Sequence, residues 1–154
     1  MNFLSLLVVF LCIYIFGNLG FHYFNKKKHE KFLLSLSVED FKRIENLSID
    51  IDVSSSKSIY NYQVNKADII LLDDHIFLLV KSKIFKIAQP ILQISRIDND
   101  EKFPYVWEEI SYISKQEINQ NLFIRGYAQR NSIKITYKIV IGFSQKDMDI
   151  IKEK

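Results

Sequence analysis

The chain has 154 residues, 48% of them hydrophobic, and a formal net charge of +3 from 21 basic and 18 acidic side chains. The positive excess lies in one short stretch, residues 26–31, which hold four Lys and one Glu. The other charges of residues 32–154 cancel, with 17 groups of each sign. A nucleic-acid-binding surface needs a basic excess or stripe, so we expect no nucleic-acid partner. A single Cys excludes a disulfide framework within the chain.

The N-terminal stretch from Phe3 to Phe24 contains no Asp, Glu, Lys or Arg. As a helix its 22 residues would reach roughly 33 Å, enough for a hydrocarbon core of about 30 Å. A cleaved signal peptide is the alternative, but it would have a positive start, an apolar core of about 7–15 residues and a small-residue cleavage site. Here the first basic residue is Lys26 and residues 17–24 are largely bulky. The pattern predicts an uncleaved transmembrane helix.

The flanks of this stretch predict its orientation. Four lysines follow the apolar run and no charged side chain precedes it, so the positive-inside rule predicts a single-pass protein of the cell membrane with a cytoplasmic C-terminal domain. Aromatic residues at the end of the run fit the membrane–water interface. The expected membrane-interface residues are Phe21, Tyr23, Phe24, Lys26, Lys27, Lys28 and Lys31.

After the span, residues 31–36 are expected to continue it as a helical connector. Ser37 then resembles an N-cap, and Val38, Phe41, Ile44 and Leu47 recur every three residues, which predicts a short helix over 38–46. From Leu47 to Val53 apolar and polar residues alternate, the period of a half-buried strand.

Short strands with tight connections make up the rest of the domain. A hairpin is predicted around residues 73–75, and Pro90 should mark an edge or kink because it donates no ladder hydrogen bond. Trp107, Ile110 and Tyr112 are candidate core anchors. The predicted strand segments are 59–64, 67–72, 76–81, 84–88, 91–97, 107–115, 122–128 and 132–143.

The C-terminus switches back to a helical pattern. Ser144 with Asp147 three residues later predicts a capped helix start. Met148, Ile150 and Ile151 would give this helix an apolar side that closes the domain.

Strands in meander order closed by a C-terminal amphipathic helix resemble bacterial PH-like and GRAM-like domains. The resemblance is carried by Ala67–Val80, by Trp107–Ile113 and by Ile135–Lys154. It implies a mainly β (α+β) fold: a transmembrane helix followed by a PH-like antiparallel barrel or bent sheet closed by a C-terminal helix. The expected domains are the anchor and basic flank, residues 1–31, and the cytoplasmic β-rich domain, residues 32–154.

No catalytic or metal-binding pattern stands out. His22, His29 and His75 have no ligand or dyad spacing, and four glycines form no phosphate loop. Asp73, Asp74 and His75 are best explained as a solvated turn, and residues 98–101 as a solvated loop without the spacing of a calcium site. We therefore expect no catalytic residues, no metal and no cofactor.

The sequence favours a membrane-tethered, non-enzymatic binding or adaptor module at the inner leaflet. Its partners would be the lipid bilayer and an unidentified protein, with the oligomeric state left open. Acidic Asp73 and Asp74 lie where phosphoinositide-reading PH domains carry basic residues, which argues against that specificity. The alternatives are recognition of a soluble partner without a lipid role and an uncharacterised enzyme.

Overall fold

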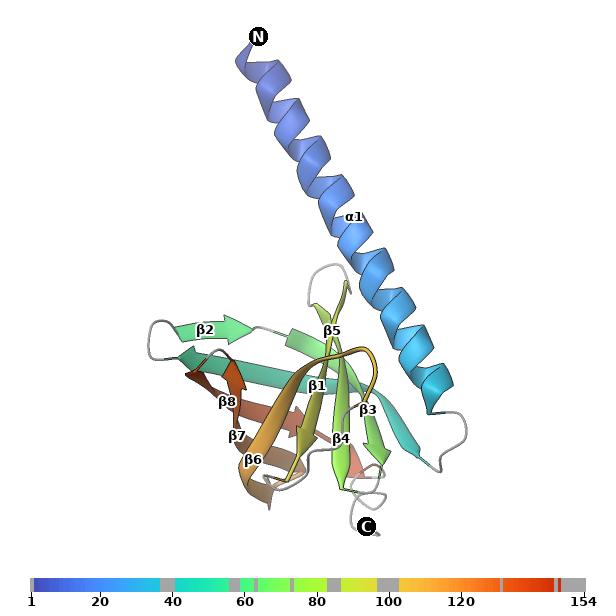
Figure 1. Ribbon diagram of the computed structural model, residues 1–154, viewed down its shortest axis with the longest axis vertical. Helices are drawn as coiled ribbons and strands as arrows, with labels where there is room; N and C mark the ends of the chain where they lie inside the picture. Colours follow the sequence, from blue (N-terminus) through green and yellow to red (C-terminus); the bar gives the residue numbers. More distant parts are fainter. Residues whose placement is uncertain are drawn as a thin grey trace.

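The computed structural model describes residues 2–36, 41–55, 59–62, 64–72, 74–82, 87–96, 103–130, 132–145 and 147. In this part of the chain one long helix precedes eight strands (Figure 1). The elements are α1 (Phe3–Ser35), β1 (Lys42–Ser55), β2 (Ile59–Tyr62), β3 (Val64–Leu72), β4 (His75–Ser82), β5 (Ala88–Ser95), β6 (Val106–Ile118), β7 (Asn121–Arg130) and β8 (Ile133–Gly142).

The strands form a closed barrel, which confirms the mainly β class. The order β1-β3-β4-β5-β6-β7-β8 closes where β8 pairs with β1, from Ser48 opposite Gly142 to Ser55 opposite Ile135. β1 is long enough to pair with β3 through its first half and with β2 through its second half. β2 therefore lies outside the seven-strand closure. Of the two arrangements expected from the sequence, the structure has the barrel and not the bent open sheet.

One strand pair departs from the expected antiparallel order. β5 and β6 are consecutive neighbours but run parallel, with Leu92 opposite Glu108 and Ser95 opposite Ser111. A parallel pair requires the chain to return along the length of the strand before the next one starts. Of the connection, residues 96–105, the structure describes 96 and 103–105, and there Phe103 packs against the outer face of β4 through Phe77. The meander expected from the sequence is therefore wrong at this step.

The helix expected at 38–46 is also wrong wherever the structure describes it, because residues 42–46 belong to β1. The register between β1 and β3 shifts between Ile44 and Leu47, where Asn46 has a positive φ of 58°. This is a β-bulge, and its extra residue turns the strand period of two into a spacing of three. Ile44 and Leu47 both face the core for that reason, which imitates one face of a helix.

The barrel interior is filled by alternate residues of each strand. On β8, within the predicted strand segment 132–143, the alternate residues Tyr137, Ile139 and Ile141 are buried. On β6 the even-numbered residues Glu108 and Ile110 face the interior and are buried. The Trp107 side chain points outward and is 56% exposed. Trp107 is thus not a core anchor. Ile110 is one, and Tyr112 packs partly buried against the same cluster.

A second apolar layer lies outside the barrel, where the last turns of α1 cover β3, β4 and β5 (Figure 1). Phe32 and Leu36 are fully buried there, and the rings of Phe32 and Phe77 lie 4.9 Å apart. α1 continues through residues 31–35 without interruption, as expected for the connector.

Some predicted features lie outside the described residues. At the C-terminus the cap is present, since Ser144 Oγ donates to Asp147 Oδ2 and accepts from the Asp147 backbone N–H. Residues 146 and 148–154, which would form the apolar side of the closing helix, are not among the described ones. The same holds for the Ser37 cap, the first part of the segment 84–88, and the loop 98–101.

The closest backbone approach in the barrel predicts a sensitive position. A Cβ at Gly126 would lie 2.7 Å from both the Ile110 side chain and the Ser111 carbonyl oxygen. We expect Gly126→Ala to lower the free energy of unfolding by about 1–3 kcal/mol, as overpacking does. Gly20→Ala, where nothing lies within 4 Å, is the matched control. Urea unfolding in detergent, followed by far-UV circular dichroism, measures both; equal midpoints would contradict the prediction.

Candidate membrane-docking site

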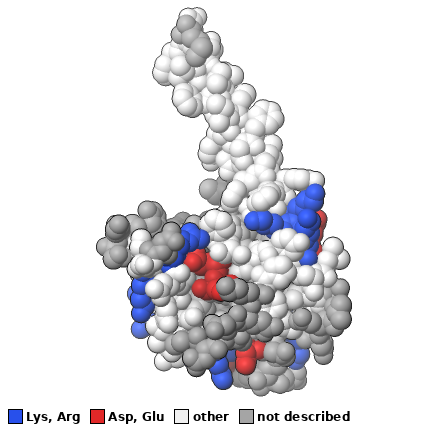
Figure 2. All heavy atoms as spheres, in the orientation of Figure 1, with Lys and Arg blue, Asp and Glu red and all other residues white. Residues whose placement is uncertain are grey.

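α1 consists of an exposed apolar part and a docked part. Its most apolar 18-residue window is entirely unburied, and Figure 2 shows this part free of charge until the helix reaches the barrel. The helix is long and apolar enough to cross a membrane, although a signal sequence has the same length and composition. The docked part begins at Asn25, the first buried residue of the helix.

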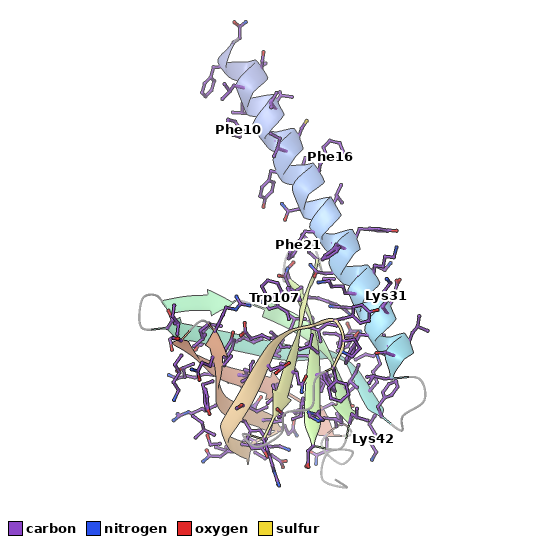
Figure 3. All side chains as sticks on the ribbon, viewed as in Figure 1. Phe10, Phe16, Phe21, Lys31, Lys42 and Trp107 are labelled. Carbon is purple, nitrogen blue, oxygen red and sulfur yellow. The ribbon has the colours of Figure 1, made fainter. Side chains whose placement is uncertain are left out.

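The predicted interface residues lie on both sides of the boundary between these two parts, the aromatic ones before Asn25 and the lysines after it. Phe21, Tyr23 and Phe24 are 44–67% exposed, and Lys26, Lys27 and Lys31 are exposed as well. The Lys28 ammonium lies 4.4 Å from the centre of the Phe24 ring. The aromatic and basic residues thus follow one another along α1 where it meets the barrel, and Figure 3 labels Phe21 and Lys31 of this group.

Two histidines of α1 bind the start of β5, a contact that the sequence did not predict. The Ala88 backbone N–H donates to His22 Nδ1 over 3.0 Å, and His29 Nε2 donates to the Gln89 carbonyl over 2.7 Å. These groups are available because β5 extends here beyond the first paired residue of β6, Val106. Gln89 and Pro90 also form a bulge opposite Val80, so Pro90 marks the expected irregularity. The helix therefore caps a free strand edge.

His29 is held as a neutral side chain. Burial lowers its pKa below the usual value, and the nearby Lys81 ammonium lowers it further, against opposing contributions from the Gln89 carbonyl and Asp68. A His whose pKa is lowered by folding stabilises the folded state above its unfolded pKa of about 6.5, and this contribution is lost as the pH falls through the folded pKa. Docking of α1 should therefore weaken under acidic conditions.

A buried carboxylate joins β1, β3 and β4 beside this contact. Asp68 is 3% exposed and accepts hydrogen bonds from Arg43 and Lys81, each 3.0 Å long, and from the Asn46 backbone N–H at the bulge. Burial alone would raise the pKa of Asp68, but these three donors lower it by more, so the net shift is downward. The group is structural, because its donors come from the same barrel.

The barrel mouth next to the helix contains a second ion pair. Glu108 points inward, pairs with Arg130 over 3.1 Å and accepts a hydrogen bond from Tyr137. Burial raises the pKa of Glu108, while Arg130 and Tyr137 oppose the rise. Beside it is an apolar cavity of about 70 Å³. Its lining residues are Ile51, Val53, Val80, Gln89, Pro90, Leu92, Trp107 and Tyr137.

The expected solvated turn at residues 73–75 is wrong for His75. Its side chain is 3% exposed and lies 3.2 Å from Gln93 Nε2 and 4.9 Å, between ring centres, from Phe103. The returning segment before β6 covers it, which sequence spacing could not reveal. Among the described residues no group of three or more His, Cys, Asp or Glu side chains is placed to hold a metal ion.

Comparison of the chain with family models, with curated proteins and with solved structures gave no match in any of the three. The resemblance to PH-like and GRAM-like domains therefore stays a prediction.

Helix docking predicts a sharp contrast between two neighbouring positions of α1. Phe32 is fully buried against the sheet, whereas Leu34 is 71% exposed. Phe32→Ala should lower the free energy of unfolding by about 3–5 kcal/mol because it leaves a cavity beside Phe77. Leu34→Ala should change it by less than about 0.5 kcal/mol. The measurement is urea unfolding of both full-length variants in detergent. A similar small effect for both would show that the helix does not pack on the barrel.

The Asp68 network predicts a pH-dependent loss. At pH 7, Asp68→Asn should cost roughly 1.5–3 kcal/mol, the value of hydrogen bonds to a charged group. Because folding lowers the pKa of Asp68, the carboxylate stabilises the protein above its unfolded pKa of about 3.9 and loses that effect as the pH falls through the folded pKa. The difference between wild type and variant should therefore narrow below about pH 4.

Thermal melts between pH 7 and pH 3 measure this difference. Asp74→Asn, at an exposed position, is the control and should stay within about 0.5 kcal/mol of wild type. A gap between wild type and Asp68→Asn that is constant with pH would contradict the ionised network.

Proposed function

We propose that this protein is a single-pass membrane protein whose barrel is a non-enzymatic binding module held against the cytoplasmic surface of the bilayer. The observation that carries the proposal is the continuity of α1. One uninterrupted helix contains both the apolar segment and the residues that dock on the barrel, Asn25 to Leu36. A rigid connection of this kind positions the barrel relative to the membrane, where a flexible linker would let it move freely.

The histidine contacts support an uncleaved anchor. His22 belongs to the apolar segment and still accepts a hydrogen bond from the barrel, at Ala88. Cleavage near residue 24 would remove this partner and leave the edge of β5 without its cap. A signal peptide, which is discarded, would have no reason to pack with the mature domain.

The charge distribution supports the cytoplasmic orientation. Lys26, Lys27 and Lys28 follow directly on the apolar segment, and Lys31 lies one turn further. Lysines within a few residues of a span are retained on the cytoplasmic side. Along α1 they come after the apolar segment, in the part of the helix that docks on the barrel, which supports a barrel in the same compartment.

A non-enzymatic role is supported by how the buried titratable groups are used. Asp68 and Glu108 are each paired with a cation from a neighbouring strand, and His29 binds a backbone carbonyl. These groups hold the fold together rather than facing a common reaction centre. The cavity at the barrel mouth, about 70 Å³, is also far below the roughly 300–1,000 Å³ of small-molecule sites.

Topology is the property to test first. A C-terminal fusion to a reporter that is active only in the cytoplasm should be active, and the same position fused to a reporter active only outside should be silent. The protein should stay in the membrane pellet after alkaline carbonate extraction, with its original N-terminus. An active external reporter, or a mature chain beginning near residue 25, would contradict the proposal.

A further inference from the structure

We propose that the barrel makes a second membrane contact of its own: its end next to α1 rests on the anionic phospholipid surface of the bilayer that α1 spans. Trp107 and Ile87 would be the apolar contacts, and Lys66 and Lys134 the basic ones. This inference rests on the proposed function, because it requires that α1 crosses the membrane.

Strand pairing shows which residues share this end of the barrel. Ala88 lies opposite Lys81 at the start of β5, and Ala88 also binds His22 at the membrane side of α1. β6 runs parallel to β5, so Trp107 near its start lies at the same end. β7 is antiparallel to β6, so the end of β7 lies at the same end of the barrel as the start of β6. The hairpin between β7 and β8, with Arg130 opposite Ile133, is therefore at this end too.

The depth of Ile87 supports direct contact with lipid. Ile87 lines a crevice of about 420 Å³ together with side chains of the apolar segment, from Tyr14 and Ile15 to His22. Leu19 also lines this crevice. It is five residues before Phe24, which at a rise of about 1.5 Å per residue places it roughly 8 Å deeper in the apolar segment. Interfacial elements bury their apolar side to about 5–10 Å. The edge of the barrel therefore reaches the level of the headgroup and acyl boundary.

Trp107 has the position and environment of an interfacial anchor. It is 56% exposed on the outside of β6, and Figure 3 places it at the end of the barrel nearest to the part of α1 that carries Phe21. The Arg130 guanidinium lies 4.9 Å from the centre of its ring. Trp is enriched at membrane–water interfaces because its ring is apolar and its N–H is polar.

The charge at this end is complementary to an anionic surface. Its buried carboxylates, Asp68 and Glu108, are already paired within the barrel. Lys66 and Lys134 remain exposed at this end, and Lys26, Lys27 and Lys31 of α1 are exposed as well, against the exposed carboxylates Glu30, Asp52 and Glu109. The balance is positive although residues 32–154 are neutral as a whole. Because the cavity at the mouth is too small for a lipid, the contact is with the surface rather than with an enclosed ligand.

The chain provides its own probe, since Trp107 is its single Trp. The full-length protein is placed in nanodiscs of phosphatidylcholine with phosphatidylglycerol, with and without bromine on the acyl chains close to the headgroup. We expect brominated lipid to quench most of the Trp107 emission. Emission typical of water, unchanged by bromine, would overturn the proposal.

A matched control moves the probe to the other end of the same strand. Ile118 is 51% exposed at the far end of β6. In the double variant Trp107→Phe and Ile118→Trp, the emission should be insensitive to brominated lipid. Equal quenching at both positions would show nonspecific contact and would also overturn the proposal.

A second comparison tests the charge. In nanodiscs of phosphatidylcholine alone, quenching of Trp107 should fall, and the double variant Lys66→Gln and Lys134→Gln should show the same fall in the anionic discs. Lys115→Gln, exposed toward the far end of β6, should quench like wild type. Quenching that is equal in both lipids would exclude recognition of anionic lipid.

Alkaline carbonate extraction distinguishes a barrel that makes no lipid contact from a protein that has no membrane-spanning helix. A protein that resists extraction but shows no quenching is anchored without a second contact. A protein released by carbonate has no spanning helix, so the proposed function fails first and this inference with it.

Discussion

The structure depends on the contact between the last turns of α1 and the outer face of β3, β4 and β5. Phe32 and Leu36 complete an apolar layer that the sheet alone would expose, including Phe77 and Ile91. Burial of such side chains is worth roughly 1.5–3 kcal/mol each, so removing the helix would leave a large unfavourable surface. The same helix continues into the apolar segment, so barrel stability and, in the proposed function, membrane attachment rely on one element.

Polar contacts fix the direction in which the barrel is held. His22 and His29 are two turns apart on α1 and bind successive residues of β5, Ala88 and Gln89. The hydrophobic effect is non-directional, whereas two hydrogen bonds at this spacing set one register between helix and strand. The free edge of β5 and its bulge at Pro90 make these backbone groups available. If β6 paired with the whole length of β5, the backbone groups of Ala88 and Gln89 would already be hydrogen-bonded and could not bind the histidines.

The ion pairs of the barrel show how charges are distributed in a domain that is neutral as a whole. Asp68 and Glu108 are buried and neutralised by Lys81 and Arg130. Lys66 and Lys134, at the end of the barrel next to α1, are exposed. The opposite end carries exposed carboxylates such as Asp74 and Glu117. Net charge counted along the chain cannot reveal this, since the topology distributes the charges. Electrostatic orientation at a membrane depends on that distribution and not on the sum.

The sequence by itself determined the apolar helix, its lysine flank and most of the strands, because these depend on local composition and on a period of two, as in Ile133–Ile141. Only the tertiary structure decided the closure of the barrel, the parallel step to β6 and the burial of His75, because these depend on which distant strands pair. The bulge at Asn46 shows the limit most clearly: one extra residue in β1 gave Ile44 and Leu47 a helical spacing. The burial of His29 was likewise not predictable from its neighbours in the chain, because it follows from contact with Gln89, 60 residues away.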